Sequence, residues 1–134
     1  MTSNSTKKVL EYSPTTVKRA ERALSASPFT LKLFKEMRNQ SVPIQNIAGE
    51  TGIESGYATL SLSEPSVEDK LVWLINVGLL RREVDGQGST DSFRLTPLGR
   101  QIIAKWEQQG DVIPRASLID RITNWLKRWL QWSL

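Results

Sequence analysis

The chain has 134 residues, of which 39% are hydrophobic and 24% charged, as in one ordinary globular domain. No apolar run approaches the roughly 18 residues of a transmembrane helix. Cysteine and histidine are both absent, which excludes disulfides, thiolate nucleophiles, zinc fingers and imidazole bases. The acids show no catalytic or metal-binding spacing and no Gly-rich phosphate loop is present, so we expect no enzyme, metal or cofactor. The lack of cysteine fits a cytoplasmic protein.

The net charge is +4 and the pI is about 9.6, which favours anionic partners. Residues 1–40 carry eight bases and three acids, whereas residues 41–79 carry five acids and one lysine. The basic N-terminal part, with Lys18 and Arg19, is a candidate surface for a nucleic-acid backbone. The alternative is an ordinary solvated helix surface.

Residues 1–12 lack an apolar core after their lysines and are expected to form a flexible leader. Ser13-Pro14 then predicts a helix start, with a capping hydroxyl followed by proline in the first turn. Ser27-Pro28 repeats this signal and predicts a second helix that runs to about Arg38.

The next segment predicts a short helix that begins at Pro43 and is ended by a left-handed Gly52. A longer helix is expected over residues 65–77, with Ser66 and Asp69 as a capping box and Gly78 as its stop. Residues 54–64 separate the two helices by more than a compact helix-turn-helix allows. Their apolar side chains either anchor this insertion to the core or form an extra turn facing a groove or partner: Tyr57, Leu60 and Leu62.

A β-hairpin follows. Residues 79–84 and 92–96 predict two strands around a tip rich in turn-forming residues. Thr96-Pro97 caps a further helix, whose inward residues are expected to be Leu98, Ile102, Ile103 and Trp106. Trp73 and Trp106 are interpreted as core residues.

The order Gly78-Leu79-Leu80, a basic strand, a variable tip and then Leu95-Thr96-Pro97-Leu98-Gly99-Arg100 resembles bacterial winged-helix regulators of the MarR, PadR and ArsR types. The resemblance covers residues 41–109, the core of an expected winged-helix domain at 13–109. We therefore expect a mainly α fold with a small β-hairpin.

The resemblance implies a transcriptional regulator that binds double-stranded DNA. Helix 65–77 would enter the groove with Ser66 and Lys70, and the wing would clamp the backbone with Arg81, Arg82 and Arg94. Alternatively, the wing arginines form a solvated strand face paired with Glu83, Asp85 and Asp91. The acids Glu68 and Asp69 at the start of the groove helix favour a second function, a protein- or membrane-docking module without DNA binding.

Residues 110–116 are expected to form a linker, and residues 117–134 an amphipathic helix capped by Ser117. Its apolar stripe is too wide to stay exposed on a soluble monomer. We expect it to pair two copies into a homodimer; packing on the chain's own core and lying on a membrane are the alternatives. The contact residues are Leu118, Ile122, Trp125, Leu126, Trp129 and Leu130.

Overall fold

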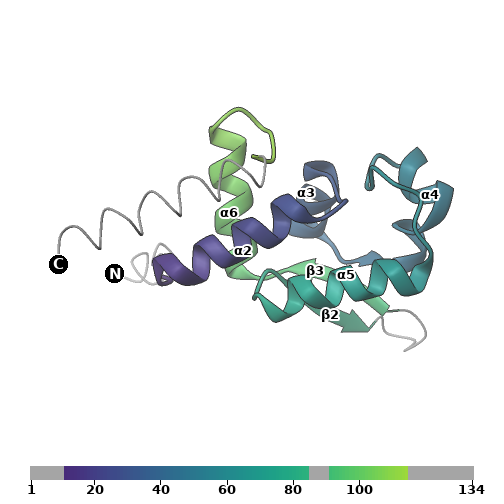
Figure 1. Cartoon of the computed structure of the whole chain (residues 1–134), viewed down its shortest axis with the longest axis horizontal. Coiled ribbons are helices and arrows are strands. Elements are labelled where there is room, and N and C mark those ends of the chain that lie inside the picture. Colours follow the sequence, from purple (N-terminus) through teal and green to yellow (C-terminus); the bar gives the residue numbers. More distant parts are fainter. Residues whose placement is uncertain (1–10, 85–90, 115–134) are drawn as a thin grey trace.

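The computed structural model describes residues 11–84 and 91–114 of the chain (Figure 1). The fold is mainly α-helical with a small antiparallel sheet, as the sequence predicts. The elements follow in the order α2 (Pro14–Ala26), α3 (Leu31–Asn39), β1 (Val42–Pro43), the 3-10 helix η1 (Ile44–Asn46), α4 (Gly49–Glu54), α5 (Glu64–Asn76), β2 (Leu80–Val84), β3 (Asp91–Leu95) and α6 (Pro97–Gln108).

Hydroxyl caps fix the starts of the first two helices. The Ser13 hydroxyl accepts a hydrogen bond from the Thr16 amide at 3.1 Å, which confirms the predicted start of α2. The expected start of the second helix at Pro28 is wrong, because α3 begins at Leu31 and is capped by Thr30. Phe29 instead forms an isolated β-bridge with Ala58, which keeps this part of the chain extended.

The segment after α3 differs from the prediction in two places. Pro43 lies in β1, opposite Ser92 of β3, and is also the N-cap of η1, so that a helix starts after it as predicted, but this helix has only three residues and α4 is separate. Gly52 does not end an element but lies buried inside α4, without a positive φ. A Cβ on Gly52 would come within 1.9 Å of the Ile47 carbonyl oxygen. The glycine is therefore needed for the close approach of α4 to the chain before it.

Residues 55–63 connect α4 to α5 and are held to the rest of the domain at several points. The Thr30 hydroxyl donates to the Gly56 carbonyl at 2.5 Å, and the Gly49 amide donates to the Leu62 carbonyl at 2.7 Å. Tyr57 and Leu62 pack against the core, as an anchored insertion requires, whereas Leu60 is 58% exposed.

The beginning of α5 also differs from the prediction. Ser63, not Ser66, is the N-cap, and its hydroxyl accepts from the Ser66 amide at 3.4 Å. The helix ends before Gly78, whose φ of 87° is the left-handed conformation expected of a glycine stop. The start of α6 is confirmed, since the Thr96 hydroxyl accepts from the Gly99 amide at 3.2 Å.

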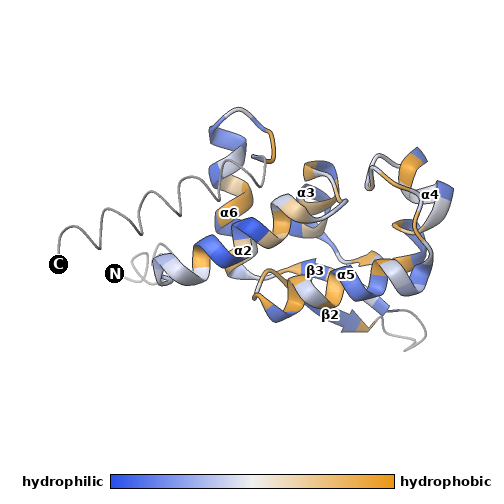
Figure 2. Ribbon diagram, viewed as in Figure 1, coloured by the Kyte–Doolittle hydropathy of each residue, from blue (hydrophilic) through white to orange (hydrophobic). Residues whose placement is uncertain are grey.

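The sheet has the strand order β1-β3-β2, with β3 in the centre. Its apolar face and the helices around it enclose one core that includes Trp106, Phe34 and Phe93. Figure 2 shows that the helices carry hydrophobic and hydrophilic residues in alternating stretches, so that one stripe of each can be buried. Within the described ranges, no helix has the length and apolar character needed to cross a membrane.

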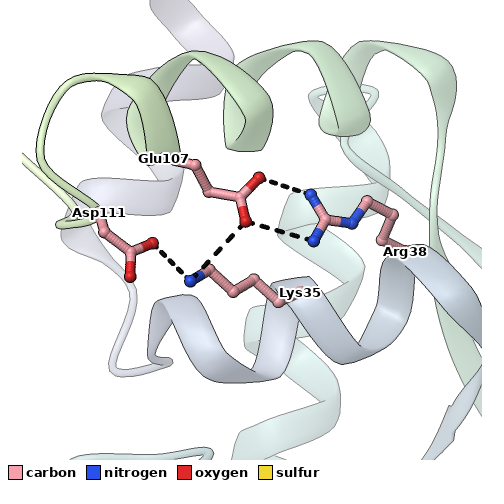
Figure 3. A network of polar contacts seen from close by, with 4 residues as sticks. All are labelled: Lys35, Arg38, Glu107 and Asp111. Atoms are coloured by element: carbon pink, nitrogen blue, oxygen red, sulfur yellow. Dashed lines mark hydrogen bonds and ion pairs between the residues drawn. The ribbon is translucent and has the colours of Figure 1, made fainter.

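A polar network joins α3 to α6 on the surface (Figure 3). The Arg38 guanidinium binds both carboxylate oxygens of Glu107, at 2.6 and 3.2 Å. Lys35 lies 2.5 Å from Asp111 and 3.7 Å from Glu107. The hydrogen bonds from Arg38 are the main reason why the pKa of Glu107 lies below its ordinary value of 4.5. The network fixes the end of α6 against α3.

Candidate nucleic-acid interface

The register of β2 and β3, the hairpin expected to be the wing, places its three arginines on two faces of the sheet. Arg81 lies opposite Arg94, and Arg82 lies opposite Phe93. Cross-strand partners share a face, and successive residues alternate between faces. Arg81 and Arg94 therefore share one face, whereas Arg82 lies on the face of the buried Phe93. The three side chains cannot act as a single clamp from one side.

Arg82 is engaged within the domain. Its Nη1 lies 2.7 Å from an Asp91 carboxylate oxygen and 3.4 Å from one of Glu68. Its guanidinium carbon is 5.2 Å from the centre of the Phe93 ring, a cation–π distance. Arg82 thus links the wing to α5 and neutralises one of the acids at the start of that helix.

Among the described residues, Arg81 and Arg94 each have fewer partners than Arg82. Arg81 pairs with Glu83 on the same strand at 2.8 Å, and its side chain is 53% exposed. Arg94 donates to the Asn39 carbonyl at the end of α3, at 3.2 Å. Two of the expected pairings are thus present, Arg81 with Glu83 and Arg82 with Asp91, and Asp85 lies outside the described residues.

The start of α5 offers little positive charge. Ser66 is half-buried, and Lys70 is exposed beside the acid Asp69. Glu64 is also exposed, in the first turn. Carboxylates near a helix N-terminus stabilise the helix through its dipole but repel phosphates. Lys70 is therefore the one cation among the exposed side chains that this end of the helix presents.

Trp73 is not a core residue, contrary to the sequence-based interpretation. Its exposed fraction is 56%, whereas Trp106 is 1% exposed and belongs to the core as predicted. The buried stripe of α5 consists of Val67, Leu71 and Leu74. Trp73 follows Leu71 by two positions, about 200° around the helix, and so falls on the other side.

Two adjoining hollows surround Trp73 between α2 and α5. They measure about 300 and 280 Å³ and share Trp73 with Ala23 and Ala26 of α2. Lys70 lines the first hollow and Arg19 the second, whereas Lys18 is half-buried elsewhere on α2. Two candidate DNA contacts, Arg19 of α2 and Lys70 of α5, therefore lie at this groove and not at the β2–β3 hairpin.

Sequence reasoning missed three features of this region. The strand β1 is only two residues long, and its partner β3 lies fifty residues later. The placement of Arg82 on the same face as the buried Leu80 follows from the alternation along β2, so the sequence contained that signal. The groove-lining Ala23 and Ala26 carry no signal that separates them from ordinary helix residues. The interface residues predicted within 117–134 lie outside the described residues.

The described residues contain no group of three or more acids that could hold a metal ion. No curated protein and no solved structure matches the chain. A family model described as Npun_F0494-like matches residues 10–128, which include every described element, both wing strands and the Trp73 groove. The chain therefore belongs to the Npun_F0494-like family.

Proposed function

We propose that this protein is a cytoplasmic winged-helix protein that binds double-stranded DNA, as a transcriptional regulator does. The observation that carries the proposal is the order of its elements. α3, β1, the short helices η1 and α4, α5, β2 and β3 follow one another as in a winged helix-turn-helix, with β3 between β1 and β2. This fold also serves other functions, so the charges on its surface have to support the choice.

The facing arginines of the wing supply that support. Like charges directly opposite each other destabilise a sheet, and Arg81 and Arg94 occupy such a pair of positions. An anion bound between them would relieve the repulsion. Phosphate oxygens suit guanidinium groups, which form two parallel hydrogen bonds to them. We assign the backbone contact to Arg81 and Arg94, and a structural role to Arg82.

The acids of α5 determine what kind of DNA binding is expected. Glu68 is partly neutralised by Arg82, but Glu64 and Asp69 remain near the place where a groove helix would meet phosphates. Most of the affinity should therefore come from the wing and from the backbone. Such binding is strongly salt-dependent and discriminates weakly between sequences.

Fluorescence anisotropy with a labelled duplex at low salt tests the proposal. The full chain should bind, and unlabelled duplexes of unrelated sequence should compete with similar strength. Replacing Arg81 and Arg94 with alanine should weaken binding by about ten-fold or more, if each lost phosphate contact is worth about 1 kcal/mol. The variant Lys32→Ala/Arg100→Ala removes the same charge outside the sheet and should bind almost normally. Absence of binding at low salt would contradict the proposal.

A second candidate function is docking of a protein partner without DNA. The exposed acids Glu64 and Asp69 at the start of α5 favour it, since they would attract a basic partner surface. In this case the duplex would not bind at low salt. Binding of a labelled poly-lysine peptide would then weaken in a Glu64→Gln/Asp69→Asn variant, and the Glu50→Gln/Glu54→Gln variant of α4 would serve as its control.

A further inference from the structure

The groove between α2 and α5 is a surface that the wing does not use. Its floor is apolar, since Ala23 and Ala26 present only methyl groups and Leu74 lies below them. Trp73 lies between the two hollows and is 56% exposed. The small side chains of α2 leave the space into which large side chains of another helix could insert.

An exposed tryptophan beside an apolar hollow is typical of a contact surface. Tryptophan removes more apolar area from water than any other side chain when it is covered, and it is enriched at the centres of interfaces. The rim is basic on one side, where Arg19 lines the second hollow, and mixed on the other, where Asp69 precedes Lys70. A helix with one apolar face, and with its charged residues on the opposite face, would fit this groove.

The chain itself contains such an occupant in residues 117–134. Seven large apolar residues recur there at helical spacing, and an apolar surface of this size is rarely left exposed to water. On a helical projection, the bases Lys127 and Arg128 fall on the side away from this stripe, and Arg121 lies at its edge. The stripe could therefore face Trp73 without bringing the two bases on the far side against Arg19 or Lys70.

The tether is short. Ile113 packs against the core, and the described chain ends at residue 114, two residues before a helix capped by Ser117 could begin. Two extended residues reach about 7 Å and an 18-residue helix about 27 Å. The family model runs through residue 128 and so includes both the groove and most of this segment. The groove and most of residues 117–134 therefore belong to the same family domain.

We propose that residues 117–134 form a helix that docks its apolar stripe into the α2–α5 groove of the same chain and covers Trp73. A short tether that spans the distance between its two sites gives an effective concentration of about 1 mM. At micromolar protein, docking within the chain therefore precedes docking onto a second copy. This proposal does not depend on DNA binding.

The absence of cysteine permits a clean cross-linking test, because every introduced cysteine is unique. Ala26→Cys, at an exposed groove position, is combined with one cysteine on the stripe, at Ile122, Leu126 or Leu130. The matched controls place the second cysteine on the opposite side, at Asn124, Lys127 or Gln131. Glu50→Cys on α4 replaces the groove cysteine as a further control. A short bis-maleimide is added at about 10 µM protein, and the products are separated by mass.

At least one stripe position should give an intramolecular product several-fold above its matched control, and about 100-fold above the dimeric product. Predominantly dimeric products would overturn the proposal and place the segment on a second copy. Equal yields from both sides of the segment, or no product, would overturn it as well. Backbone amide spectra give an independent measurement on the unsubstituted chain. Deleting residues 115–134 should shift the signals of Ala23, Ala26 and Trp73, and unchanged signals would contradict docking.

Discussion

Arg81 of β2 lies directly opposite Arg94 of β3 in the antiparallel pairing of the wing. Each guanidinium has a different local partner: the Glu83 carboxylate for Arg81 and the Asn39 carbonyl for Arg94. These partners offset the repulsion between the two arginines without removing the positive charge of Arg94. The neighbouring Arg82 faces the other way and is held by two carboxylates. Arg81 and Arg94 therefore form a pair of facing cations on one side of the hairpin, whereas Arg82 supports the fold on the other side.

Arg81→Thr should leave stability unchanged or raise it slightly. The substitution removes a like-charge pair, and threonine suits a strand, so the free energy of unfolding should change by less than about 0.5 kcal/mol. Duplex binding should nevertheless weaken. Urea unfolding and duplex anisotropy at low salt measure the two effects. A large loss of stability would show that Arg81 supports the fold, contrary to its assignment as a contact residue.

Gly52→Ala should destabilise the domain by about 2 kcal/mol, in the range of overpacked cores. The added Cβ meets the Ile47 carbonyl oxygen at 1.9 Å, and backbone atoms cannot move aside as a flexible side chain can. Gly49→Asn is the matched control, because nothing lies within 4 Å of a Cβ there and asparagine tolerates the φ of 63°. The control should lose less than about 1 kcal/mol in urea unfolding. Equal losses would contradict the close approach at Gly52.

The ion pair between Glu107 and Arg38 predicts a dependence of stability on pH. Because the pKa of Glu107 is lower in the folded chain than its ordinary value of 4.5, the carboxylate contributes stability above that value. This contribution is lost as the pH falls through the lower folded pKa.

Thermal unfolding of the wild type and of Glu107→Gln should therefore differ at pH 7 and converge as the pH falls below 4.5 and through the lower folded pKa. The carboxylate is partly exposed to solvent, so the difference at pH 7 should be small. A difference that does not depend on pH would mean that Glu107 acts through packing alone.

The sequence contained the signals that are local. Ser13, Thr96 and Gly78 start or stop helices through hydrogen bonds and dihedral angles that involve only near neighbours. These features were predicted correctly. The alternation of apolar residues in the hairpin also predicted β2 and β3 within one residue.

Non-local contacts explain most of the errors. Pro28 resembles a helix start until the bridge between Phe29 and Ala58 is known, and the single helix expected after Pro43 is divided into η1 and α4. Gly52 resembles a helix stop, yet it is required by the approach of Ile47. Trp73 is interpreted as a core residue from the sequence, although its position around α5 leaves it 56% exposed. The candidate site was only partly predictable: the face of Arg82 follows from the strand alternation, whereas the groove around Trp73 depends on how α2 packs against α5.

The most direct test of DNA binding by the wing is the salt dependence of duplex affinity. The logarithm of the binding constant should fall linearly with the logarithm of the salt concentration, with a contribution of about 0.9 from each phosphate contact. In the Arg81→Ala/Arg94→Ala variant the slope should be shallower by roughly 1.8, since two contacts are lost. The Lys32→Ala/Arg100→Ala variant should keep the wild-type slope. An unchanged slope in the wing variant, or an equal change in both variants, would contradict the assignment of Arg81 and Arg94 as the DNA contact.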